Sequence, residues 1–194
     1  MNNSPHLHLP ISVRLVMLKV LAALLPGIAV YVWFFGAAIL VQIALASAAA
    51  LAGEAAMLRL RGKPVARFLS DGSALVTAWL IALTFPPIAP WWLIVSATLF
   101  AIVVAKHLYG GLGQNPFNPA MVAFCVAIIA FPALMSQWPA VGFTDFAAQM
   151  QVIFQSQSAQ DAVTMATPLD ALRTQLHVPE ARATVAGVLG SHAS

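Results

Sequence analysis

The chain alternates between long apolar stretches and short breaks that carry polar residues, glycine or proline. Five stretches approach the roughly 20 apolar residues that cross a bilayer as a helix; they are residues 18–35, 37–58, 73–89, 91–108 and 119–136. Phe35-Gly36 separates the first two, and Pro86-Pro87 with Pro90 separates the third from the fourth. Because glycine and proline interrupt helices, the pattern predicts an all-α integral membrane protein of about five transmembrane helices.

This pattern divides the chain into three segments. Residues 1–17 form an N-terminal arm, residues 18–136 the transmembrane domain, and residues 137–194 a polar segment. Hydrophobic residues make up 61% of the chain and charged residues 8%, against about 25% charged in soluble domains. The single cysteine, Cys125, lies in an apolar stretch, which excludes a disulfide framework. We expect a lipid bilayer around the helices and no metal site.

Lysine and arginine are unevenly distributed over the predicted loops. Seven of the nine fall on one face of the predicted bundle: Arg14, Lys19, Arg59, Arg61, Lys63, Arg67 and Lys106. Cytoplasmic loops carry such an excess. We therefore expect a cytoplasmic N-terminus and, after five crossings, a segment 137–194 in the periplasm of a Gram-negative bacterium. Since the basic residues flank apolar spans and form no surface stripe, nucleic acid is not an expected partner.

The loop between the fourth and fifth predicted helices reads KHLYGGLGQNPFNPA, residues 106–120. Gly110, Gly111, Gly113, Asn115 and Asn118 predict irregular backbone there. Unpaired backbone groups are costly in lipid, so such a loop lies at the surface or lines a cavity within the protein. A plain turn between helices and a re-entrant segment lining an ion pathway both fit. A nucleotide loop fits poorly, because its lysine and hydroxyl are missing.

Three ionisable residues, Glu54, Asp71 and His107, lie near the ends of the predicted helices. An acid inside the membrane would be a candidate for a proton path, but these positions fall at predicted cytoplasmic ends. We interpret Asp71 or Ser70 as a helix cap, and Glu54 and His107 as residues of the membrane interface.

A polar stretch, DAVTMATPLDALRT, occupies residues 161–174. Thr167 followed by Pro168 is typical of a helix start, with the threonine oxygen at the N-cap and proline at the first helical position. An alternative is that the same hydroxyl is esterified to a phosphate, because a helix N-terminus favours phosphate. Local chemistry leaves both interpretations open.

The run DGSALVTAWLIALTFPPIAPWWLIVSATLFAIVVAKHLYGGLGQNPFNPAMVAF, followed by TMATPLDALR, resembles the D subunits of Rnf (or Rsx) electron-transport complexes. That family is related to the B subunits of sodium-translocating NADH:quinone reductases. The similarity extends from about Leu15 to His177. It implies a fold of about ten helices in two inverted repeats, so this chain resembles one half. Either it is part of a longer protein or its second half is supplied otherwise.

In that family a threonine in the motif Asp-x-x-Ser/Thr-Gly-Ala-Thr carries FMN through a phosphoester bond made by a separate flavin transferase. The matching positions are Asp161, Thr164, Met165, Ala166 and Thr167, with Thr167 as the acceptor and Met165 in place of glycine. Riboflavin between the helices is a further cofactor to consider. The resemblance implies a periplasmic site for the flavin, in agreement with the charge distribution.

The resemblance implies a membrane subunit of a multisubunit oxidoreductase in the bacterial inner membrane. Electrons would pass through the flavin between partner subunits, between NADH and a ferredoxin-type carrier, and drive Na⁺ or H⁺ transport. No catalytic residue is expected in this chain, and the subunit is not expected to be catalytic alone. Ion passage would use backbone and small polar groups of the 110–118 loop. The alternatives are a passive channel or transporter half without flavin, and a structural assembly subunit.

Overall fold

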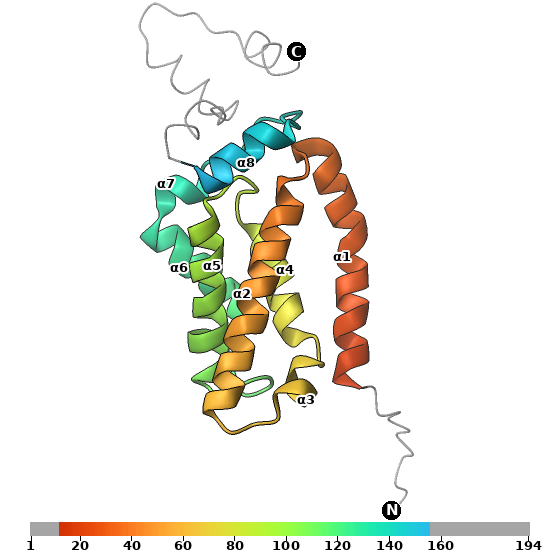
Figure 1. Cartoon of the computed structure of the whole chain (residues 1–194), viewed down its shortest axis with the longest axis vertical. Helices are drawn as coiled ribbons and strands as arrows, with labels where there is room; N and C mark the ends of the chain where they lie inside the picture. Colours follow the sequence, from red (N-terminus) through yellow and green to blue (C-terminus); the bar gives the residue numbers. More distant parts are fainter. Residues whose placement is uncertain (1–11, 156–194) are drawn as a thin grey trace, which may run out of the picture.

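The structure, a computed structural model, describes residues 12–155, and within this range it contains helices and no strand (Figure 1). The main helices are α1 (Val13–Phe35), α2 (Ala38–Leu60), α4 (Ser73–Thr84), α5 (Trp91–Phe100) and α6 (Pro119–Ala130). α5 continues as a π-helix, η1 (Ala101–His107). Three shorter helices complete the order: α3 (Val65–Leu69), α7 (Pro132–Met135) and α8 (Phe146–Phe154). The all-helical prediction is confirmed for the described residues.

Two of these helices, α1 and α2, are long and apolar enough to cross a membrane. Three further helices are apolar but shorter: Ser73–Thr84, Trp91–His107 and Pro119–Ala130. The shortening has a simple cause at two of the predicted spans. α4 ends before Pro86-Pro87, and the predicted span 119–136 is divided between α6 and α7 where Pro132 begins the next helix. Proline has no N–H to continue the hydrogen-bond ladder.

The core lies where α2 packs against α4 and α5, and α1 stands at the edge of the bundle (Figure 1). Many of the fully buried core residues are alanines, including Ala46, Ala50, Ala78 and Ala82, each 0% exposed. Such small side chains let helix backbones approach closely, which is typical of membrane helices. In α1, by contrast, Ile28 is the one buried residue. The apolar residues of α1 therefore face outward for most of its length.

A tight turn joins α1 to α2, as the Phe35-Gly36 pair predicts. Gly36 has φ of 80°, and its N–H donates to the carbonyl of Val32. The carboxamide of Gln149 fixes this turn from the side: its oxygen accepts from the backbone N–H of Ala38 at 3.0 Å and its Nε2 donates to the carbonyl of Phe35 at 2.7 Å. Gln149 itself is 0% exposed.

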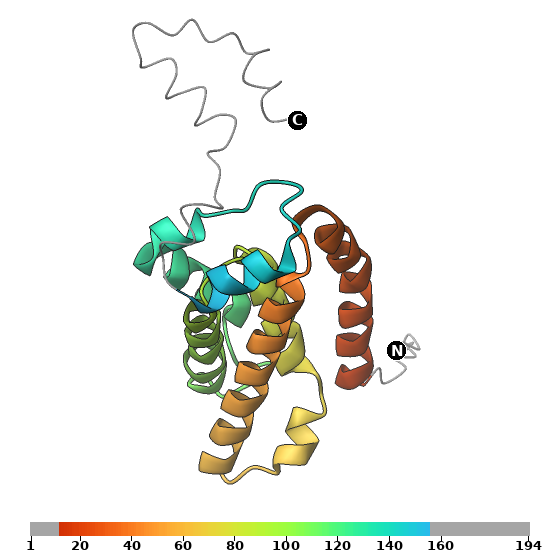
Figure 2. The same cartoon turned by 45° about the horizontal axis from the view of Figure 1, so that its top comes forward.

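Gln149 belongs to α8, which lies across the end of α2 (Figure 2). The Asp145 carboxylate caps this helix by accepting from the N–H of Ala147 at 2.9 Å, while Val152 and Ile153 are each 1% exposed. The described part of the predicted polar segment 137–194 therefore contains a packed amphipathic helix.

The connections fall at two opposite ends of the bundle. The α2–α3–α4 connection and the loop after η1 lie at one end, and the α1–α2 turn and α8 lie at the other (Figure 1). The first end holds the basic residues Arg59, Arg61, Lys63 and Arg67. Successive helices therefore run in alternating directions, and the basic loops gather at one end of the bundle, as the distribution of basic residues predicts.

Candidate functional site

A buried ion pair joins α2 to the end of η1. Lys106 Nζ lies 2.8 Å from Glu54 Oε2, and the two side chains are 3% and 4% exposed. The same ammonium donates to the hydroxyl of Ser73 at the start of α4, also at 2.8 Å. Three helices far apart in the sequence therefore meet at one charged group.

The π-helical backbone of η1 brings two consecutive side chains to this point. The N–H of Leu108 donates to the carbonyl of Val103, and the N–H of Gly111 to that of Lys106, both five residues back. Lys106 and His107 are both buried, at 2% and 4% exposure. Such widened turns are frequent at functional sites.

Arg61 extends the cluster to the loop that follows. Its NH1 lies 3.2 Å from His107 Nδ1, and its NH2 donates to the carbonyl of Gly110 at 3.2 Å. Because a guanidinium only donates, Nδ1 must accept, which leaves the imidazole proton on Nε2. His107 Nε2 lies 3.2 Å from Glu54 Oε2, without the alignment of a hydrogen bond. Arg61 thus holds the imidazole and the loop in place beside the carboxylate.

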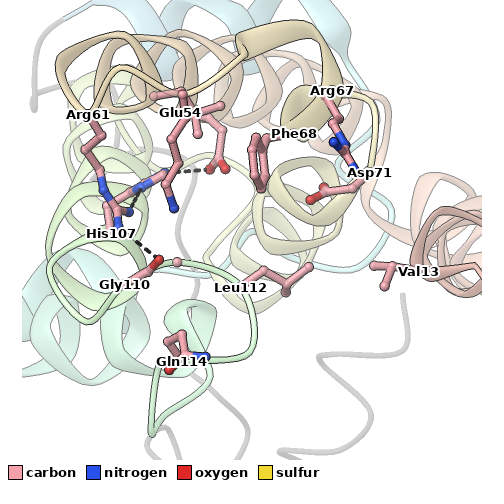
Figure 3. A pocket seen from close by; sticks show the side chains of 13 residues that line it. Val13, Glu54, Arg61, Arg67, Phe68, Asp71, His107, Gly110, Leu112 and Gln114 are labelled. Carbon is pink, nitrogen blue, oxygen red and sulfur yellow. Dashed lines mark hydrogen bonds and ion pairs between the residues drawn. The ribbon is translucent and has the colours of Figure 1, made fainter.

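A cavity of about 580 Å³ opens onto this cluster (Figure 3). Glu54, His107 and Arg61 form one side, and Arg67 and Asp71 lie across from them. Of the predicted pathway loop, Gly110 and Gly111 line the cavity. Both glycines have positive φ, 110° and 102°, which lets the chain turn sharply beneath Arg61.

A second cavity, of about 270 Å³, is bordered by the Lys106 member of the ion pair. Lys106 and Ser73 line it together with Asn115 and Asn118. Leu112 lines both cavities, whereas Gly113 lines neither and provides a further positive φ of 82°. The structure therefore brings four of the five predicted loop residues to cavities that flank the Glu54–Lys106 pair.

The sequence pattern places Glu54 and His107 near the cytoplasmic ends of the helices. The structure adds that both side chains are buried inside the bundle. Sequence reasoning also misses Lys106 as their partner, because the pair is separated by 52 positions and forms only when α2 packs against η1. The N-cap residue of α4 is Gly72, which has no side-chain capping bond, but Asp71 Oδ1 accepts from the N–H of Ser73, the first helical residue, at 2.7 Å.

The predicted flavin-attachment residues, Asp161, Thr164, Met165, Ala166 and Thr167, lie outside the described residues. Among residues 12–155, no group of three or more His, Cys, Asp or Glu side chains is arranged to hold a metal ion.

Comparison with known proteins agrees with the resemblance seen in the sequence. The model of the NQR2, RnfD, RnfE family matches residues 1–193. The chain is 46% identical over 198 residues to the D subunit of the ion-translocating oxidoreductase complex of Citrobacter koseri, which covers 92% of this chain and 56% of that relative. Proteins of the same name from Escherichia fergusonii and Escherichia coli are 46% identical over 191 and 190 residues, with 90% of this chain and 54% of each relative covered. The chain spans about half the length of these curated relatives. It belongs to the NQR2, RnfD, RnfE family.

Proposed function

We propose that this chain is part of a membrane subunit of an ion-translocating oxidoreductase complex. In this proposal a covalently bound FMN passes electrons between partner subunits, between NADH and a ferredoxin-type carrier, and the transfer drives Na⁺ or H⁺ across the bacterial inner membrane. Membership of the family and the names of the relatives support it. The partners are the other subunits of an Rnf-type complex and, during maturation, a flavin transferase.

The observation that carries the ion-handling part is the buried Glu54–Lys106 pair between two cavities. Ionisable residues inside membrane helices are costly and mark ion pathways or proton relays. A buried ion pair is also no better for stability than well-packed apolar residues. Glu54 and Lys106 are therefore better explained by function. The carboxylate of Glu54 would bind the passing ion, while Lys106 balances its charge when the ion is absent.

The flavin part of the proposal rests on the motif at residues 161–167. Thr167 is the anchor, with Asp161, Thr164, Met165 and Ala166 as the surrounding motif. FMN supplies the electron-transfer chemistry when bound, and the protein fixes its position. α8 supports a periplasmic position, because it lies at the end of the bundle opposite the basic loops (Figure 1). In this topology the N-terminus is cytoplasmic and residues 137–194 are periplasmic.

The 270 Å³ cavity is the best candidate for riboflavin. Asn115 and Asn118 line it from the loop and Thr77 from α4. Asn115 Nδ2 donates to the carbonyl of Phe117 and Asn118 Oδ1 accepts from the N–H of Ala120, so the other amide atom of each side chain remains for a ligand. The cavity volume of about 270 Å³ lies just below the lower limit of about 300 Å³ for ligand pockets. It would therefore hold part of a flavin ring.

Electron-driven ion uptake into inverted membrane vesicles tests this proposal. In the assembled complex, Glu54→Gln should lower uptake at least about tenfold, a loss of roughly 1.4 kcal/mol or more in the coupling step. Asp145→Asn is the matched control, because it removes an exposed acid that caps a helix and lines neither cavity. Normal uptake with Glu54→Gln would exclude the carboxylate from the ion path. Passive ion flow that needs no electron donor would favour a channel or transporter half.

A further inference from the structure

The basic end of the bundle carries positive charge that its own acids leave unpaired. Arg61, Lys63 and Arg67 all line the 580 Å³ cavity. Neither of the ion pairs found within residues 12–155 includes any of the three. Arg61 uses one N–H toward His107 and one toward Gly110, which leaves further guanidinium donors for a ligand.

The two carboxylates on the cavity wall do not balance these cations. Glu54 is paired with Lys106 behind the wall, so that pair is neutral as a unit. Asp71 accepts from a backbone N–H at the start of α4 and remains the one acid facing three cations. The cavity is therefore complementary to an anion.

Apart from Gln114, the remaining side chains of the cavity wall are apolar. Val13 and Leu112 are 49% and 45% exposed, and Phe68 is 38% exposed with Lys63 Nζ 5.4 Å from its ring centre. A free phosphate would leave this surface in contact with water. A ligand with a phosphate and an acyl chain would contact both parts of the wall (Figure 3).

We propose that this cavity, formed by the α2–α3 connection and the loop after η1, binds an anionic phospholipid. The phosphate accepts hydrogen bonds from Arg61 and pairs with the charges of Lys63 and Arg67, and the acyl chains lie along Val13 and Phe68. Basic pockets at the cytoplasmic ends of membrane helices bind anionic headgroups in this way. The lipid would hold α3 against the loop that carries Gly110. This inference does not depend on flavin attachment.

Binding to the full-length chain in neutral detergent tests the proposal, with phosphatidylglycerol as the probe and the shift in melting temperature as the readout. The variant is Lys63→Gln with Arg67→Gln. The control is Lys19→Gln with Arg59→Gln, which removes two exposed cations of the same end that do not line the cavity. Removal of each lining cation should weaken binding about fivefold, the loss expected for one basic residue at an anionic lipid surface.

The proposal is supported if phosphatidylglycerol stabilises the wild type more than phosphatidylcholine with the same acyl chains does. The affinity for phosphatidylglycerol should also fall about 25-fold in the cavity variant and less than about threefold in the control. Equal losses of affinity in the cavity variant and the control would show a general electrostatic attraction between the basic end and anionic lipid, and would overturn the proposed site. Equal stabilisation by inorganic phosphate, or by phosphatidylcholine, would overturn the phospholipid as ligand. Lys63→Gln alone gives the same comparison if the double variant does not fold.

Discussion

Lys106 Nζ and Glu54 Oε2 lie 2.8 Å apart inside the helical bundle, with both side chains almost fully buried. Gly53, next to Glu54, lies where α2 packs closely on α5, since a Cβ there would come within 3.1 Å of Leu99 Cδ2. The pair is the one point in the described chain where opposite charges meet in the core. Loss of the Glu54–Lys106 pair should lower both the stability of the fold and ion transport.

The first prediction concerns the stability of this pair. Glu54→Gln leaves the Lys106 ammonium buried without its carboxylate and should lower the free energy of unfolding by about 3–5 kcal/mol. Lys106→Met in the same chain removes the unpaired cation and should restore part of that loss. Unfolding of the two single variants and the double variant in detergent measures the coupling. Additive losses would contradict an interaction between the two residues.

The second prediction compares two glycines with positive φ. Gly36 and Gly62 have φ of 80° and 64°. A Cβ at Gly36 would overlap the carboxamide of Gln149, whereas a Cβ at Gly62 would meet nothing within 4 Å. Gly62→Ala should cost about 1–2 kcal/mol from the backbone alone. Gly36→Ala should cost more, because its ψ of −177° places it in a region that essentially only glycine occupies and because Gln149 must also move and lose its bonds to the α1–α2 turn. Equal melting temperatures would contradict both effects.

The third prediction concerns orientation. In a Cys125→Ser background, Lys63→Cys places the one thiol at the basic end of the bundle. A membrane-impermeant maleimide should leave this thiol unlabelled in intact cells and label it after the cells are opened. The matched variant Thr144→Cys, exposed near α8 at the opposite end, should react from outside. The reverse pattern would contradict the topology.

The helix boundaries were largely predictable because they depend on local chemistry. Glycine and consecutive prolines interrupt the helical hydrogen-bond ladder, and the structure has its breaks at Phe35-Gly36 and Pro86-Pro87. Pro132 divides the last predicted span for the same reason. α8 could also have been recognised, since Gln149, Val152 and Ile153 recur at helical spacing and are all buried.

The buried charges were not predictable from local sequence. Nothing near Glu54 distinguishes an interface acid from a paired core acid, because its partner lies on another helix. The π-helical turn of η1, which brings Lys106 and His107 to the same acid, leaves no signal in the sequence AIVVAKH. Asn115 and Asn118 were found because glycine and proline mark their loop, but the cavity they share with Lys106 depends on packing.

The most direct test of the proposed function is flavin fluorescence of the denatured protein in a gel. With the flavin transferase co-expressed, the wild type and Thr164→Ala should show a fluorescent band, and Thr167→Ala should show none. Only a covalent bond survives denaturation, so the band reports attachment itself. Absence of fluorescence from the wild type, or fluorescence that persists in Thr167→Ala, would contradict FMN attachment at Thr167.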